Sequence, residues 1–264
     1  MILVFDVGNT ELSIGLFSES ELRGHWRVMT DVARTPDEFG VLIRSLLAAG
    51  DFARESVESV AIGSVVPRVT GPLSEACVRY FAVGEPLIVD ASARLPITLD
   101  VDEPLTVGAD RIINTLAASR LYEHDAIVVD MGTANTFDCI TAEGVFLGGV
   151  IAPGVLTSAE TLTRRTSKLP ATELTIPTRV IGRRTEECIR AGVMFGAADA
   201  IDGIVRRIKA TWPRTQAPIV IATGGFAEAM ADLCTTFDRV EPHLTLQGLQ
   251  LAHVLLREGR QTVA

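Results

Sequence analysis

Two stretches far apart in the chain share one pattern, and this repeat limits the possible folds more than any other feature. Residues 2–17 contain an apolar, β-branched run that ends at Asp6, then a glycine turn, then a second apolar alternation. Residues 126–140 repeat that order, with Asp130 at the end of the first run. Each stretch predicts a β-hairpin with a carboxylate at its corner. Their recurrence predicts an internal duplication.

A corner of this kind has the groups that a phosphate requires. A glycine beside the end of a strand lets backbone N–H groups approach an anion, and the adjacent carboxylate can share a cation with that anion. Two such corners can face each other across a cleft and hold a polyphosphate from both sides. The alternative for either stretch alone is an ordinary hairpin with a polar tip.

Composition and charge exclude several classes of protein. At 264 residues with 47% hydrophobic content the chain can form one large domain or two smaller ones, and the duplication favours two. A formal charge of −9 with two tryptophans argues against a nucleic-acid surface. We expect no membrane segment and no secretory leader, because the sequence lacks a run of about 18 apolar residues and a basic start. Four cysteines without a C-x-x-C pair favour a reducing cytoplasm.

Strand-like and helix-like segments alternate along the chain. The sequence Thr35-Pro36-Asp37-Glu38 is a capping box that should begin a helix. We expect helices over residues 36–49, 71–81, 158–165, 186–210 and 226–237, and further strands over 60–66, 86–90 and 218–223. Thr185 is the expected N-cap of the long fourth helix. This alternation is typical of an α/β fold with mixed sheets.

Asp110 and Arg111 open another predicted helix, just after Gly108. In the first helical turn, Asp110 could accept a proton from a substrate hydroxyl while Arg111 binds a carboxylate. The alternative is structural, since an aspartate near a helix start is often a cap and an adjacent Asp-Arg is often a solvated pair.

Glycines mark two further places of close backbone approach. Residues 148–154 contain Gly148-Gly149 and Ala152-Pro153-Gly154, which predict contact with a ligand or with another chain segment. Gly224 follows a strand and precedes a helix, a position that suits a nucleotide, although no dinucleotide fingerprint is present. The serines and isolated histidines form no hydrolase motif.

Five motifs in this order resemble those of type III pantothenate kinases, over nearly the whole chain. They are Asp6-Val7-Gly8-Asn9-Thr10, Gly108-Ala109-Asp110-Arg111, Asp130-Met131-Gly132-Thr133-Ala134, Gly148-Gly149 with Ala152-Pro153-Gly154, and Ala222-Thr223-Gly224-Gly225. The family belongs to the actin-like ATPase superfamily, with the sugar and acetate kinases. The resemblance implies two duplicated actin-like (ribonuclease H-like) domains, residues 1–115 and 116–264, with mixed β-sheets flanked by helices and an active site in the cleft between them.

The resemblance also implies an activity, the ATP-dependent phosphorylation of pantothenate to 4′-phosphopantothenate, the first step toward coenzyme A. Asp110 would be the general base, Asp130 would bind an activating K⁺ or NH₄⁺, and Asp6 would lie near the Mg²⁺ of ATP. The implied ATP contacts are Asp6, Val7, Gly8, Asn9, Thr10, Glu11, Leu12, Ser13, Thr133 and Gly224. The implied pantothenate contacts are Val101, Gly108, Ala109, Asp110, Arg111 and, across a homodimer interface, Thr185.

The chain departs from the family pattern at three positions. Val101 stands where the family usually has tyrosine, and Glu11 and Arg184 stand where asparagine is common. Two alternatives remain, a non-catalytic ATP-binding regulator on the same scaffold and a kinase of the superfamily with another small-molecule acceptor. The intact Asp6, Asp110 and Asp130 favour an enzyme, and the motif at residues 108–111 favours pantothenate as acceptor.

Overall fold

The computed structural model describes residues 1–261, which form two compact units. The first unit combines Met1–Ala117 with the described chain from Leu244 onward, and the second unit is Ala118–His243. From the sequence we expect a boundary at residue 115, with everything after it in one domain. In the structure the last helix returns to the first unit. None of the described helices is long and apolar enough to cross a membrane.

The first unit is built on a mixed sheet with the strand order β3-β2-β1-β4-β5. β1 pairs antiparallel with β2 and parallel with β4, so the predicted first hairpin is confirmed. The strands of this sheet are β1 (Ile2–Val7), β2 (Glu11–Ser18), β3 (Glu21–Met29), β4 (Ser59–Ser64) and β5 (Leu87–Val89). The short β6 (Thr98–Leu99) lies in the same part of the chain but is not a strand of this sheet. Its helices are α1 (Pro36–Ala49), α2 (Pro67–Phe81), α3 (Ala109–Tyr122, which continues into the second unit) and α7 (Leu244–Gln261), with 3₁₀ turns η1 (Arg54–Ser56) and η2 (Pro104–Thr106).

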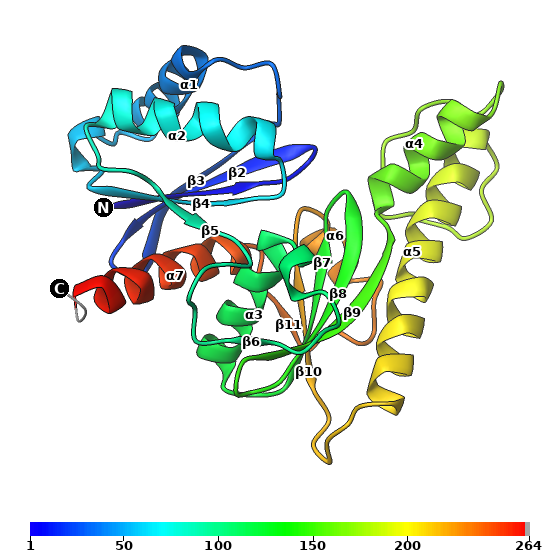
Figure 1. Ribbon diagram of the computed structural model, residues 1–264. Helices are drawn as coiled ribbons and strands as arrows, with labels where there is room; N and C mark the ends of the chain where they lie inside the picture. The colour runs from blue at the N-terminus through cyan, green and yellow to red at the C-terminus, as the bar shows by residue number, and fades with distance from the viewer. Residues whose placement is uncertain (262–264) are drawn as a thin grey trace. The chain divides into compact units, whose positions relative to one another are not determined.

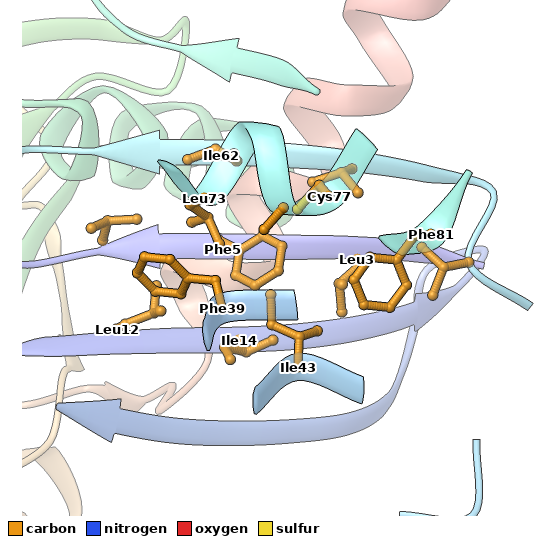
Figure 2. Packing of buried hydrophobic residues seen from close by; sticks show 14 of the residues in the cluster. Leu3, Phe5, Leu12, Ile14, Phe39, Ile43, Ile62, Leu73, Cys77 and Phe81 are labelled. Carbon is orange, nitrogen blue, oxygen red and sulfur yellow. The ribbon is translucent and has the colours of Figure 1, made fainter. Parts of the chain in front are cut away.

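Helices cover both faces of this sheet, because successive strand residues point to opposite sides. Leu3 and Phe5 of β1 lie in the cluster that α1 and α2 cover, which Figure 2 shows from close by. Val4, between them, lies in a second cluster with Ile113 of α3 and Leu249 of α7. The first unit is therefore a three-layer α/β/α sandwich, with α7 as part of one outer layer (Figure 1).

Of the first two helices, α1 begins at the predicted residue and α2 begins earlier than predicted. Thr35 accepts a hydrogen bond from the Glu38 N–H at 3.3 Å, and the Glu38 carboxylate accepts one from the Thr35 N–H at 2.7 Å, so the capping box of α1 is confirmed. α2 begins at Pro67 rather than at residue 71. Proline is well suited to the first helical position, because that residue needs no N–H partner within the helix.

The second unit repeats the strand arrangement of the first. Among its own strands the order is β9-β8-β7-β10-β11, the counterpart of β3-β2-β1-β4-β5. β7 pairs antiparallel with β8 and parallel with β10, as β1 does with β2 and β4. The strands are β7 (Ala126–Met131), β8 (Ala134–Ile140), β9 (Val145–Pro153), β10 (Ile219–Thr223) and β11 (Arg239–Val240). The predicted internal duplication is confirmed.

Three helices pack on the second sheet, namely α4 (Val155–Arg165), α5 (Thr185–Ala210) and α6 (Ala227–Ala231). The prediction of a helix as far as residue 237 was wrong, since α6 has only five residues. The N–H groups of Thr235 and Thr236 instead donate to the buried Asp202 carboxylate of α5, at 2.9 and 3.1 Å. These hydrogen bonds hold the chain in a turn where a longer helix was expected.

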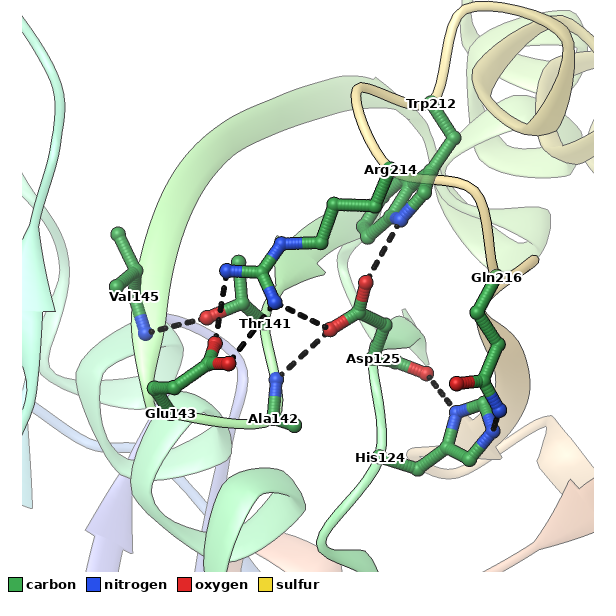
Figure 3. Close-up of polar contacts among 9 residues, drawn as sticks. All are labelled: His124, Asp125, Thr141, Ala142, Glu143, Val145, Trp212, Arg214 and Gln216. Atoms are coloured by element: carbon green, nitrogen blue, oxygen red, sulfur yellow. Dashed lines mark hydrogen bonds and ion pairs between the residues drawn. The ribbon is translucent and has the colours of Figure 1, made fainter.

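A polar network fixes the amino-terminal end of β7 (Figure 3). The buried Asp125 carboxylate accepts hydrogen bonds from the Trp212 indole and the Ala142 N–H, both at 2.9 Å. Arg214 pairs with Glu143 at 2.8 Å and holds the pKa of that carboxyl at about 2. The network ties the segment after α5 to the sheet. It lies at the end of β7 opposite Asp130, so we assign it a structural role.

Candidate active site

The first corner joins β1 to β2 and is held by the residue that follows β3. The Gly8 N–H donates to the Glu11 carbonyl at 3.0 Å and closes the turn. Thr30 donates its N–H to the Thr10 carbonyl at 2.9 Å and its hydroxyl to the Gly8 carbonyl at 2.7 Å. Thr30 is absent from the sequence-based set of site residues, because its role depends on the pairing of β3 with β2.

Burial separates the predicted ATP contacts at this corner into two groups. Val7 and Leu12 are fully buried, so their side chains belong to the core and only their backbone can meet a ligand. Asp6 is half-buried at the carboxyl end of β1, whereas Asn9 and Thr10 are exposed at the tip. The half-buried or exposed members of the predicted set also include Gly8, Glu11 and Ser13. The accessible surface of this corner is therefore an acid followed by a polar turn.

The second corner closes in the same way as the first. The Gly132 N–H donates to the Ala134 carbonyl at 3.0 Å. The Thr133 carbonyl accepts hydrogen bonds from the Gly154 N–H at 3.2 Å and from the Thr157 hydroxyl at 2.6 Å. The start of α4 is thereby fixed against the turn. Gly154 is required there, since a Cβ at this position would collide with the Gly132 carbonyl.

Gly224 packs directly against the acid of the second corner. β10 runs parallel to β7 with Thr223 opposite Asp130, and the next residue is Gly224 with φ +89°. A Cβ on Gly224 would lie 2.5 Å from the Asp130 carboxylate and 2.7 Å from the Met131 nitrogen. The structure thus places Gly224, from one predicted motif, against Asp130, from another.

Asp110 lies in the first turn of α3, as predicted, in the same unit as the first corner. Its carboxylate accepts a hydrogen bond from the Arg111 N–H at 2.8 Å. Burial raises the pKa of Asp110, and this effect exceeds the opposite influence of the Arg111 N–H and guanidinium. A carboxylate with a raised pKa is a better proton acceptor than an exposed one, so this environment suits a general base.

One residue connects Asp110 with the first corner. Val65 donates its N–H to the Val7 carbonyl at 3.1 Å, next to Asp6. A Cβ on Gly108 would lie 3.4 Å from the Val65 side chain and 2.5 Å from the Asp110 carboxylate. Gly108 therefore lies between the end of the first corner and the predicted base, and the absence of a side chain there leaves room for the carboxylate.

Replacing Gly108 by alanine is expected to displace the Asp110 carboxylate and lower the rate of phosphoryl transfer by about 10²-fold, the usual effect of misplacing a catalytic group by about 1 Å. Steady-state kinetics and a crystal structure of the variant would measure both changes. Gly71→Ala is the matched control in the same unit, because its Cβ would meet no atom within 4 Å. A Gly108→Ala enzyme with the wild-type rate would show that the position of Asp110 is unimportant.

The remaining predicted substrate-binding residues lie in the described part of the chain. Val101 is half-buried between β6 and η2, and Arg111 is half-buried in the first turn of α3. Thr185 is exposed and is the first residue of α5, with Arg184 at the N-cap position, so the predicted cap is displaced by one residue. None of the contacts described above connects Val101 or Thr185 with Asp110 or with either corner.

The carboxylates at the two corners suit a cation that is bound partly by protein and partly by phosphate oxygens. No group of three or more possible metal-binding side chains occurs among residues 1–257, whose side chains the structure describes. Mg²⁺ in nucleotide sites is usually bound by one or two carboxylates together with phosphate oxygens and water. Asp6 provides one carboxylate at the first corner and Asp130 one at the second, which agrees with this mode of binding.

Comparison with solved structures confirms the fold. A protein assigned to the Baf family of transcriptional activators from Campylobacter jejuni is 18% identical, covers 97% of this chain and 99% of its own, with a TM-score of 0.58. An activator of 2-hydroxyisocaproyl-CoA dehydratase from Clostridium difficile, solved with ADPNP, is 13% identical over 100% and 98% of the chains, with a TM-score of 0.57. A ROK hexokinase from Thermus thermophilus is 11% identical over 97% and 99%, with a TM-score of 0.51.

These similarities establish the predicted actin-like α/β fold and, at such low identity, nothing about substrate. The sequence pattern is more specific. The model of the type III pantothenate kinase family matches residues 2–207, which include both corners and the motif with Asp110. Sequence motifs, duplicated topology and this match agree. The chain therefore belongs to the type III pantothenate kinase family, a family of kinase enzymes.

Proposed function

We propose that this enzyme transfers the γ-phosphoryl group of ATP to the hydroxyl of pantothenate in the cytoplasm and forms 4′-phosphopantothenate, the first intermediate of coenzyme A biosynthesis. One observation carries the proposal. The motif at residues 108–111 lies next to the first corner, connected to it through Val65, and it presents a half-buried carboxylate with a raised pKa. A proton acceptor beside a phosphate corner is the arrangement that a hydroxyl kinase requires.

Each part of the reaction has a candidate residue in this chain. Asp110 takes the proton of the pantothenate hydroxyl while the oxygen of that hydroxyl forms a bond to the γ-phosphorus of ATP. The bond between the γ-phosphorus and the bridging oxygen of the β-phosphate breaks, and ADP is released. Arg111, one residue on, would pair with the pantothenate carboxylate. The backbone N–H groups of the first turn would face phosphate oxygens, with Asp6 sharing Mg²⁺ with them.

The second corner has a separate proposed role. Asp130 would bind a monovalent cation, K⁺ or NH₄⁺, and Thr133 and Gly224 would contact the nucleotide. Such a cation would supply positive charge to a phosphate site that has no lysine among its predicted residues. The packing of Gly224 against Asp130 supports this assignment, because it restricts the positions that the carboxylate can take.

The test is pantothenate-dependent ADP release by the purified enzyme with Mg²⁺ and ATP, in buffers containing K⁺, Na⁺ or a large organic cation. We expect turnover with pantothenate, faster in K⁺ than in the other two buffers. Equal rates in all three would contradict the cation role alone. ATP binding without turnover in any buffer would favour a regulator, and ADP release with a sugar instead of pantothenate would favour another acceptor.

We further propose that the active form is a homodimer. Several exposed large apolar side chains of the second unit lie on β9, on α4 and in the segment before α5. They are Ile151, Leu156, Leu162, Ile176, Val180 and Ile181, with Ile181 84% exposed. Patches of this kind usually mark protein interfaces. Thr185 follows this segment and is itself exposed, so a second copy seated here could bring it to a partner's substrate.

Replacing Ile181 by aspartate is expected to shift the protein from dimer to monomer in light scattering coupled to gel filtration, because a charge would have to be desolvated in an apolar contact. Val41→Asp is the matched control, since Val41 is also exposed but lies on α1 of the first unit. A monomeric wild-type protein, or a dimer unaffected by Ile181→Asp, would contradict the proposed interface.

A further inference from the structure

A cavity of about 80 Å³ lies within the first unit, at the ends of the strands opposite to the first corner. It is lined by residues at or before the amino-terminal ends of β4 and β5, among them Ser59 and Glu85, and by His253 and Arg257 of α7. β4 runs parallel to β1, so Asp6 lies at the other end of these strands. The volume is several times the ~10–15 Å³ that one water molecule needs.

The buried group at this cavity is His253. Its side chain lines the cavity and is 3% exposed, and its Nδ1 has no hydrogen-bond partner among the residues that the structure describes. Burial, with a smaller contribution from Arg257, lowers the pKa of His253 to about 4, so the ring is neutral near pH 7. Buried polar atoms are nearly always hydrogen-bonded in folded proteins. Nδ1 itself is enclosed by protein, so a molecule in the cavity would meet the other atoms of the ring that line it.

The charges around the cavity have both signs. Arg257 and Glu85 are exposed and make no ion pair with the side chains described in residues 1–257, whereas Glu58 lies 3.2 Å from the N-terminal amine. Two carboxylates would repel a simple anion, and Arg257 would repel a simple cation. No metal site of three or more ligands occurs in the described chain. A ligand with one positive and one negative charge best complements the charged side chains around the cavity.

We propose that the cavity binds a small zwitterion of amino-acid size. Its carboxylate pairs with Arg257, its ammonium group pairs with Glu85, and one of its polar groups hydrogen-bonds to the His253 ring. The site is separate from the candidate active site, and its occupation does not depend on the proposed kinase function.

The experiment is an NMR titration of the full-length protein with glycine as the probe, following the imidazole ¹⁵N resonances of His253. We expect a saturable shift with a dissociation constant on the order of 1 mM, which suits a ligand with so few atoms. Arg257→Gln and Glu85→Gln should each weaken binding by about 10-fold, the effect of losing one charged hydrogen bond. Arg23→Gln, which removes an exposed arginine from β3, should leave the affinity unchanged.

Acetate and ethylammonium separate the two charges of the probe. Each should bind at least about 10-fold more weakly than glycine if both rim charges contribute. A site that binds acetate as well as glycine would be an anion site, and the proposal would be wrong. The proposal also fails if glycine produces no saturable shift at concentrations of about 50 mM, well above the expected constant, or if Arg257→Gln binds as tightly as the wild type.

Discussion

Replacing Asp110 by asparagine is expected to lower kcat for pantothenate phosphorylation by about 10²–10⁴-fold, the range found when a general base is removed. Asparagine keeps the shape of the side chain but cannot accept the hydroxyl proton. The fold should be retained. Burial raises the pKa of Asp110, so ionisation is less favourable in the folded than in the unfolded chain, and a neutral side chain removes that cost near pH 7.

The pH dependence provides the second measurement on the same variant. The rate of the wild type should rise with pH as Asp110 loses its proton, with an apparent pKa above the ordinary value of 3.8. The stability contribution has the opposite sign, because ionisation of a group with a raised folded-state pKa destabilises the protein as pH increases. In the Asp110→Asn variant, kcat/KM should no longer rise with pH in this way. Asp102→Asn, an exposed neighbour, should retain it, and an unchanged profile in Asp110→Asn would exclude Asp110 as the base.

Gly224→Ala should have the second largest effect and act on both stability and rate. The left-handed φ of +89° costs a residue with a Cβ about 1–2 kcal/mol, and the collision with Asp130 and Met131 adds about 1–3 kcal/mol. We therefore expect a loss of about 2–5 kcal/mol in the free energy of unfolding. The Asp130 carboxylate must also move, so the advantage of K⁺ over Na⁺ in turnover should disappear. Denaturant unfolding and kinetics in the two buffers would measure these effects.

Gly192→Ala is the matched control in the second unit. Gly192 lies inside α5, and a Cβ there would meet no atom within 4 Å. Alanine in a helix interior should stabilise this variant by about 0.5–1 kcal/mol, with no change in rate. If Gly224→Ala were as stable as Gly192→Ala and still responded to K⁺, the close packing around Asp130 would have no functional importance.

The elements that could be predicted are those whose cause lies within a few neighbouring residues. The corners at Asp6 and Asp130 depend on an apolar run followed by a glycine turn, and both are present. The start of α1 depends on Thr35 and Glu38, which bond to each other across one helical turn. Asp110 falls in the first turn of α3 because the apolar spacing after it has the period of a helix.

The features that the sequence did not reveal depend on distant residues. α6 ends early because Thr235 and Thr236 bond to Asp202, more than thirty residues before them. Thr30 supports the first turn only through the pairing of β3. Val65 and Val7 are brought together by the parallel pairing of β1 with β4, and Gly108 approaches Val65 from the segment before α3. Hydrophobic periodicity reports the face of an element and contains no information about its partner.

The return of α7 to the first unit has a consequence for protein synthesis. The strands of the first sheet are translated early. The sheet face that contains Val4 and Ala61 packs against α7, and α7 is translated only after the whole second unit. The second unit is continuous in sequence and can fold as it emerges, whereas the first must wait. We expect a released chain that ends at His243 to be protease-resistant over the second unit and sensitive over the first. The part of the protein made first would then be the last to mature.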